Sequence, residues 1–198
     1  MHLIFKHAKI NNRKEEKGLS LIESAMVLAL AATVTAGVMF YYQSASDSNK
    51  TQSAISEVMS ATSAINGLYI GQSNYDGLDV NVLKNSSAIP DNYKNDSGIS
   101  NPFGGALMVG AAGTNNNSFG YYIKLDKLPK SACVSLATLN LGTSAAGYGI
   151  GIASPSGVTA FSGPLGPTVG KATAITPAEA ANNCTSSNNG NSVTYFMK

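Results

Sequence analysis

The sequence is poor in the residues on which enzymes usually depend. Its 198 residues include no tryptophan, two histidines and two cysteines, and only 12% of them are charged. Both histidines, His2 and His7, lie before Gly18. If the segment before Gly18 is removed, the remaining chain has no histidine, which excludes His-based catalytic triads and His-containing zinc sites. Two cysteines leave no convincing metal-ligand set. We therefore expect no enzyme, no metal site and no cofactor.

Positive charge is scarce outside the first residues. Five of the thirteen lysine and arginine residues precede Gly18 with two of the eleven acids, so the chain after Gly18 has eight bases and nine acids. This distribution makes no phosphate-binding patch, and no nucleic-acid partner is expected. Basic residues before an apolar run are typical of a cytoplasmic flank that orients a membrane segment. The second half, rich in Ser, Thr, Asn, Gly and Ala, is typical of a secreted or surface protein.

A long apolar run follows the basic segment. The stretch from Ser24 to Tyr42 is uncharged, and as a helix its 19 residues would span about 28 Å, close to the ~30 Å hydrocarbon core of a bilayer. No proline or turn cluster follows it, and apolar residues then recur at intervals of three and four, so we predict one helix from Leu19 to Tyr69. Its amphipathic half carries a stripe at Ile55, Val58, Thr62, Ile65 and Tyr69, with Met59 and Leu68 beside it.

Beyond Gly71 the chain consists of short segments separated by Gly, Asn, Pro and Ser, which predicts strands joined by turns. Strands are predicted at 106–109, 119–125, 148–152, 158–161 and 193–197. Two short helices are predicted, one at 130–140 and one after Thr176, whose spacing to Glu179 is that of a capping box. The length suits one globular domain with an appended segment. The expected fold class is α+β.

The junction KGLSLIES, from Lys17 to Ser24, places a glutamate inside the apolar run. An acid in a spanning helix costs roughly 2.5 to 3.5 kcal/mol on insertion scales. A cleaved signal peptide is one interpretation, because the Ala-rich part of the run offers small-residue cleavage sites. Against it, the leader is long and contains two acids, and the apolar run continues to Tyr42. A plain uncleaved anchor is another interpretation, but it leaves Glu23 unexplained.

KGLSLIES resembles the processing junction of type IV pilins, in which a dedicated peptidase cuts after the glycine and methylates the new amine. The resemblance implies that residues 1–18 are a leader, that the cut falls between Gly18 and Leu19, and that the amine of Leu19 is methylated. Glu23 becomes the fifth mature residue, where that family has its glutamate. A mature chain that begins with Leu rather than Phe, a long leader and a late cysteine pair resemble the type IVb branch.

Further segments are similar to the major pilins that build bundle-forming pili: INGLYIGQ, SAIPDNY, NPFGG, ACVSLATLNLGTSA, AITPAEAA and VTYFMK. The resemblance implies a long N-terminal helix, with a transmembrane half at 19–42, packed on an antiparallel sheet in a head at 43–198 that has short helices and a disulfide-closed C-terminal region. It implies a homopolymer that forms surface filaments for bacterial auto-aggregation and adherence. Implied partners are the prepilin peptidase, the inner-membrane assembly machinery, neighbouring pili and the host cell surface. The implied location is the Gram-negative inner membrane before assembly and the extracellular pilus afterwards.

Glu23 is expected to act in assembly. A cationic amine at Leu19 of a neighbouring subunit would neutralise it, so that burial of the charge favours docking. Its own Leu19 amine, four residues away, is the alternative partner. Small residues along the same helix would allow other helices to approach closely: Ala25, Ala29, Ala32, Ala36 and Gly37.

Cys133 and Cys184 are the only cysteines, and in an exported chain we expect them to form a disulfide. Two unpaired buried thiols are the alternative. The glycine-rich stretches GYGIGIAS and SGPLGPTVG lack the register of a phosphate-binding loop, so tight packing is the expected reason for their glycines.

Two other functions are open to this sequence. A minor pilin or a type II secretion pseudopilin shares the junction, although the cysteine-closed head and the segments above argue against it. A membrane-tethered enzyme would need a catalytic set that the chain after Gly18 does not show.

Overall fold

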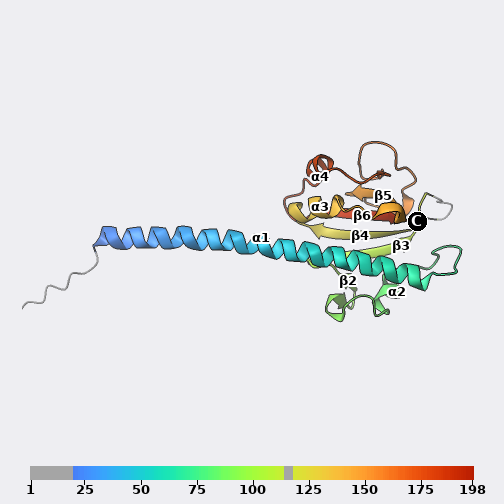
Figure 1. Ribbon diagram of the computed structural model, residues 1–198, viewed down its shortest axis with the longest axis horizontal. Coiled ribbons are helices and arrows are strands. Elements are labelled where there is room, and N and C mark those ends of the chain that lie inside the picture. The colour runs from blue at the N-terminus through green and yellow to red at the C-terminus, as the bar shows by residue number, and fades with distance from the viewer. Residues whose placement is uncertain (1–19, 114–117) are drawn as a thin grey trace, which may run out of the picture. The chain divides into compact units, whose positions relative to one another are not determined.

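The computed structural model describes residues 20–113 and 118–198. The chain divides into two compact units, Met1–Gln43 and Ser44–Lys198. Helix α1 (Leu21–Leu68) supplies the described helix of the first unit and the first element of the second (Figure 1). The predicted long helix is therefore confirmed over the described residues, while its predicted first residue, Leu19, lies outside them.

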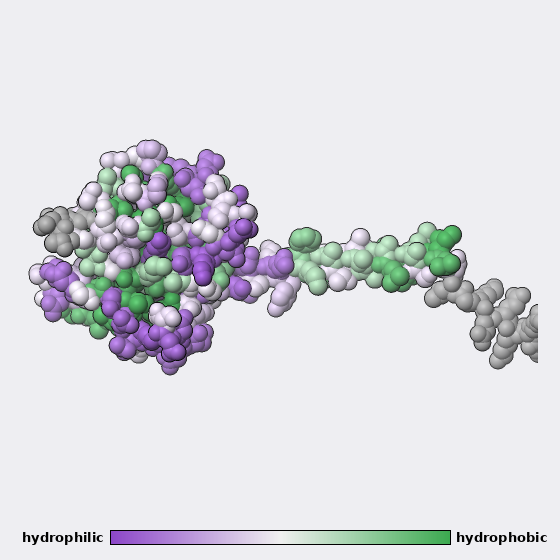
Figure 2. Space-filling model, turned by 180° about the vertical axis from the view of Figure 1, so that it is seen from behind, coloured by the Kyte–Doolittle hydropathy of each residue, from purple (hydrophilic) through white to green (hydrophobic). Residues whose placement is uncertain are grey.

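In the first unit, α1 is exposed along its length and its surface is mostly apolar (Figure 2). Its threonine hydroxyls bond within the helix: those of Thr33 and Thr35 donate to the carbonyls of Ala29 and Ala31 at 3.1 and 2.8 Å. A helix whose backbone and hydroxyl groups are satisfied internally and whose surface is mostly apolar suits lipid or the interior of an assembly. By length and composition, α1 contains a segment able to cross a membrane.

The second unit is built on a six-stranded antiparallel sheet with the order β1-β2-β3-β4-β6-β5. The strands are β1 (Lys94–Asn95), β2 (Gly98–Ser100), β3 (Ala106–Ala111), β4 (Tyr121–Leu128), β5 (Ala145–Ile150) and β6 (Asn191–Met197). The C-terminal strand β6 lies between β4 and β5 and pairs with both. All seven residues of β6 are buried, so both faces of the sheet are covered along this strand.

Short helices connect the strands: α2 (Val80–Lys84), α3 (Lys130–Ala137) and α4 (Pro177–Asn183), with 3-10 turns η1 (Asp91–Tyr93), η2 (Gly142–Ser144) and η3 (Pro155–Gly157). The capping box of α4 is confirmed. The Glu179 amide donates to the Thr176 hydroxyl at 3.3 Å, and the Glu179 carboxylate accepts from the Thr176 amide at 2.9 Å. α3 begins after Pro129 as predicted but ends at Ala137, and α2 was not predicted.

Four of the predicted strands are present with shifted ends, as β3, β4, β5 and β6. The prediction of a strand at 158–161 was wrong, because this segment is a loop. Its apolar side chains pack against Phe196 in a small second cluster, and its backbone accepts hydrogen bonds from Gly170 and Ala172 rather than from a neighbouring strand. Alternating apolar residues therefore marked burial here, not a ladder.

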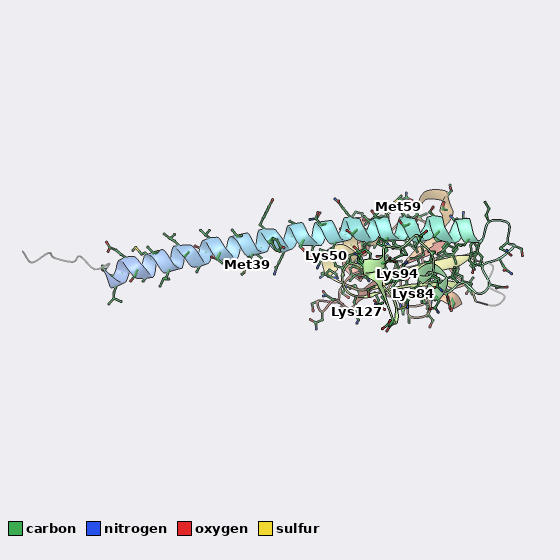
Figure 3. The ribbon with its side chains drawn as sticks, turned by 90° about the horizontal axis from the view of Figure 1, so that it is seen from below. Met39, Lys50, Met59, Lys84, Lys94 and Lys127 are labelled. Atoms are coloured by element: carbon green, nitrogen blue, oxygen red, sulfur yellow. A yellow bond between two sulfur atoms is a disulfide. The ribbon has the colours of Figure 1, made fainter. Side chains whose placement is uncertain are left out.

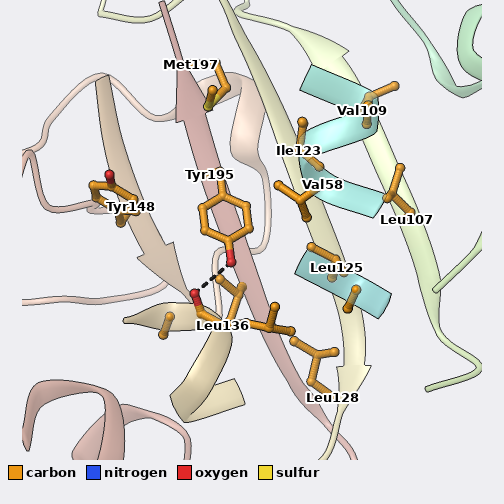
Figure 4. Close-up of a cluster of buried hydrophobic side chains, with 14 of the residues drawn as sticks. Val58, Leu107, Val109, Ile123, Leu125, Leu128, Leu136, Tyr148, Tyr195 and Met197 are labelled. Carbon is orange, nitrogen blue, oxygen red and sulfur yellow. Dashed lines mark hydrogen bonds between the residues drawn. The ribbon is translucent and has the colours of Figure 1, made fainter. Parts of the chain in front are cut away.

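From Ser44 onward, α1 covers one face of the sheet with Ala54, Glu57, Val58, Ala61 and Ile65 buried. In Figure 4, Val58 faces Leu107, Val109, Ile123 and Leu125 of β3 and β4. The predicted stripe is confirmed: Val58 and Ile65 are buried, and Ile55 and Tyr69 are partly buried against the same core. Met59 and Leu68, however, are 59% and 51% exposed. The buried face includes alanines because small side chains let the helix approach the sheet closely.

The opposite face of the sheet explains the glycines of β5. A Cβ atom at Gly147 would overlap the ring of Phe161, and one at Gly149 would lie 2.5 Å from the Ile152 side chain. Tight packing, as predicted, accounts for Gly147 and Gly149. It does not account for Gly151, whose φ of +69° lies in the left-handed region with open space around it, nor for Gly166 in the second glycine-rich stretch, where a Cβ atom would meet nothing within 4 Å. Across the core, Tyr195 is fully buried and its hydroxyl donates to the carbonyl of Leu136 at 2.7 Å (Figure 4). This bond joins β6 to α3.

Candidate assembly site

Glu23 lies in the first turn of α1 and caps the helix. Its carboxylate accepts a hydrogen bond from the Ser20 amide at 2.9 Å, and the Ser20 hydroxyl accepts one from the Ile22 amide at 3.4 Å. Amides in the first turn have no partner within the helix, and the helix dipole favours an acid at this end. The capping role was not anticipated from the sequence. Glu23 therefore stabilises the start of its own helix, and an experiment on its role in assembly must distinguish that role from capping.

The charge of Glu23 has no ion-pair partner in the described ranges 20–113 and 118–198. Its side chain is exposed. The expected partner, the amine of Leu19, and the expected cleavage site at Gly18 both lie outside the described residues. Cleavage, methylation and the pairing of Glu23 with an amine therefore stay predictions.

The first half of α1 presents large apolar side chains to its surroundings, from Leu21, which is 89% exposed, to Tyr42, which is 74% exposed. The alanines singled out in the sequence are spaced by four, three and four residues, which places them on one face of the helix. A Cβ atom at Gly37 would meet nothing within 4 Å. The small size of Gly37 is therefore not required by the subunit itself, and packing between helices of different subunits is a use for it.

The predicted disulfide joins Cys133 and Cys184, whose Cα atoms are 5.9 Å apart and whose sequence separation is 51 residues. Both cysteines are fully buried. Cys133 lies in α3 and Cys184 is the C-cap of α4. The bridge fixes the segment that leads into β6 against the helix that Tyr195 also contacts. A loop of this length corresponds to roughly 4 kcal/mol of stabilisation on the chain-entropy model.

Glu57 is a buried acid that the sequence analysis missed. It is only 3% exposed, and neither carboxylate oxygen has a hydrogen-bond partner among the described residues. Burial raises the pKa of this carboxyl from 4.5 to about 8. Its position, three residues after Ala54 and four before Ala61, was the available signal. That spacing places Glu57 on the buried face of the helix.

A groove of about 450 Å³ borders Glu57. On α1 it is lined by polar side chains, and across from them by two residues of the segment that leads into β1: Asn49, Gln52, Ser53, Ser56 and Ser60 on the helix, and Pro90 and Tyr93 opposite. Within the part of the chain that the structure describes, no three His, Cys, Asp or Glu side chains come together in a set able to hold a metal ion.

The fold matches that of a solved pilin structure. The crystal structure of a type IVb pilin from Salmonella typhi matches 73% of this chain and 97% of its own, with a TM-score of 0.53 at 20% sequence identity. The long N-terminal helix, the antiparallel sheet and the disulfide-closed C-terminal region thus define a type IV pilin fold, as the sequence predicted.

Sequence comparisons narrow the class. The family model described as Bundlin matches residues 43–198. Two relatives, each described as the major structural subunit of bundle-forming pilus, come from Escherichia coli O111:H- and Escherichia coli O127:H6. Each is 68% identical to this chain over 193 residues, which cover 96% of this chain and 99% of the relative. This chain belongs to the bundlin family.

Proposed function

We propose that this chain is the major structural subunit of a bundle-forming type IVb pilus and that it polymerises through α1. The observation that carries the proposal is the 68% identity, over nearly the whole length, to two major structural subunits of such pili. The apolar half of α1 supports it, because so large an exposed apolar surface is stable in lipid or under other subunits.

Processing precedes assembly in this proposal. Prepilin peptidase removes residues 1–18 by cleavage between Gly18 and Leu19, and the new amine of Leu19 is methylated. The register of GLSLIE supports this step, as does the start of α1 at Leu21, close behind the junction. Residues 19–42 then hold the subunit in the inner membrane, and residues 43–198 form the head.

Charge neutralisation drives docking of the processed subunit. The carboxylate of Glu23 is costly in an apolar environment, and the cationic Leu19 amine of an adjacent subunit removes that cost. Lipid contacts of α1 are exchanged for contacts between helices, which the alanine face allows to be close. The capping bond to Ser20 is compatible with this role, since it uses one carboxylate oxygen.

The subunit has a structural role and no catalytic one. Its filaments are extracellular and act in auto-aggregation and in adherence to host cells, through contacts with neighbouring pili and with the host surface. The kinship with major subunits of bundle-forming pili supports these roles.

Filaments sheared from cells that produce this chain should consist almost entirely of it. Quantitative mass spectrometry of the sheared fraction measures its copies against those of other pilin-like proteins, and we expect it in large excess over all of them. Filaments whose bulk is another chain, with this one present in a few copies, would show a minor pilin instead.

A further inference from the structure

The groove beside Glu57 combines a buried acid with polar neighbours and no cation. Three serine hydroxyls and two side-chain amides of α1 line it. No lysine is among the described residues that line it. The carboxylate of Glu57 lies below this surface with both oxygens unsatisfied. Such a group is rare in a folded chain, because a buried acceptor without a partner loses its hydration and gains nothing in exchange.

The charged groups on the surrounding elements do not complete the site. On α1, Asp47 and Lys50 lie about three and about two turns before Glu57. On the facing segment, the ammonium of Lys94 is 2.9 Å from the Asp91 carboxylate and donates to the Ser86 carbonyl at 2.9 Å. The described core side chains packed on this face of α1 are uncharged, and their polar groups are tyrosine hydroxyls: Tyr93 lines the groove, and the Tyr121 hydroxyl donates to the Asn66 side chain of α1 at 3.2 Å. The cost of removing the Glu57 carboxylate from water is therefore not offset by a nearby positive charge in the described part of the subunit.

Donors for such a site are present on the surface of the same chain. Every basic residue after Gly18 is a lysine, and four of the eight donate hydrogen bonds within the subunit: Lys84, Lys94, Lys124 and Lys171. The side chains of the other four make no hydrogen bond or ion pair in the described part of the chain: Lys50, Lys127, Lys130 and Lys198. Figure 3 labels Lys50 on α1 and Lys127, which lies at the irregularity of β4 between Leu125 and Leu128.

We propose that the groove beside Glu57 receives a lysine side chain from a second copy of this chain. The inference rests on the proposed polymeric function. The hydroxyl and amide oxygens would accept hydrogen bonds from the ammonium, and the carboxylate would supply the opposite charge. The pair would be buried in the filament and absent in the free subunit, so it would favour the assembled state.

A lysine suits this groove better than a free metal ion. Its long apolar stem can follow the groove while the ammonium reaches the acid. Calcium and magnesium favour several oxygen ligands, often more than one carboxylate, and here Glu57 is the only acid among the described lining residues. Charge complementarity therefore selects an ammonium carried by the protein itself.

The substitution Glu57→Gln is expected to have opposite effects on the stability of the free subunit and of the filament. In the unfolded chain Glu57 ionises near its ordinary pKa of 4.5, whereas in the folded subunit it ionises near 8. Folding stability is therefore lost progressively as the pH rises between these values, and the glutamine variant escapes this loss. Melting of the full processed subunit in detergent should show little difference at pH 4.5 and a midpoint raised by roughly 10 to 20 °C in the variant at pH 9.

The same substitution should lower the thermal stability of assembled filaments, although it raises that of the free subunit at high pH. At pH 7 to 8 the glutamine variant's filaments should dissociate at a lower temperature than wild-type filaments, because the intersubunit pair is lost. Asp91→Asn is the matched control, because it removes a nearby carboxylate that is 96% exposed. It should neither raise the melting midpoint of the free subunit nor lower the stability of the filaments. If Glu57→Gln filaments were as stable as wild-type filaments or more stable, the lysine pairing would be overturned, while the proposed pilus function would stand. Absence of wild-type filaments would overturn the proposed function as well.

The donor is identified by replacing Lys50, Lys127, Lys130 and Lys198 one at a time with methionine. One of these variants should lower filament stability as much as Glu57→Gln does, and combining it with Glu57→Gln should cause no further loss. Additive losses from every lysine would overturn the proposed pair. So would an equal loss from Lys94→Met, which would place the partner inside the subunit.

Discussion

Replacing Glu23 with alanine is expected to leave the subunit in the inner membrane and to reduce surface filaments by roughly 100-fold. A factor of that size corresponds to the roughly 2.5 to 3.5 kcal/mol that separate a charged from a neutral residue in an apolar helix. Insertion should be unchanged or improved, because the costly charge is gone, and cleavage should continue at Gly18. Immunoblots of membrane and sheared fractions measure processed subunit in each.

Glu23→Gln is the matched control for the capping function. Glutamine retains an oxygen that can accept the hydrogen bond from the Ser20 amide, but it carries no charge. If capping alone matters, worth about 1 kcal/mol, the glutamine variant should make normal filaments. If charge neutralisation matters, it should fail as alanine does. Abundant normal filaments from Glu23→Gln cells would refute the docking mechanism while leaving the family assignment intact.

Removing the disulfide is expected to lower the free energy of unfolding of the second unit by roughly 4 kcal/mol. The bond closes a long loop and holds α3 beside the segment before β6. Urea denaturation of the processed chain in detergent measures the loss in a Cys133→Ala/Cys184→Ala variant, and the amount of surface filament should fall with it.

Wild-type protein reduced before denaturation provides the control for that experiment, because it loses the bond without losing side-chain atoms. Reduced wild-type protein and the double variant should have similar unfolding midpoints, both below that of the oxidised protein. Equal midpoints for oxidised and reduced wild-type protein would show that the bridge contributes nothing to stability.

The predictable parts of the fold are those whose signal is local in the sequence. The apolar run determines α1, and the capping box at Thr176 determines the start of α4. The segment 158–161 was misassigned because its alternation reflects contact with Phe196, which is distant in sequence. β1 and β2 are two and three residues long. They are too short to show a period.

The same distinction between local and tertiary signals applies to the residues of the candidate site. The roles of Gly18, Leu19 and Glu23 are predicted from a linear junction of neighbouring residues and stay predictions. The disulfide, which followed from two cysteines in an exported chain, is present. Glu57 could not be assigned in this way, because its burial depends on how closely α1 approaches the sheet. Ala54 and Ala61, the small buried side chains on either side of it, allow a close approach and give only a weak hydrophobic signal in the sequence.

The intact mass of subunits from sheared surface filaments, recorded without reductant, is the most direct test of the account. A processed pilin predicts one mass: that of residues 19–198, increased by the CH2 gained when one methyl group replaces an amine hydrogen and decreased by the two hydrogens lost in the Cys133–Cys184 bond. A mass that corresponds to the uncleaved chain, or to a start near Ala32 or Gly37 as an ordinary signal peptide would give, would contradict processing at the Gly18 junction.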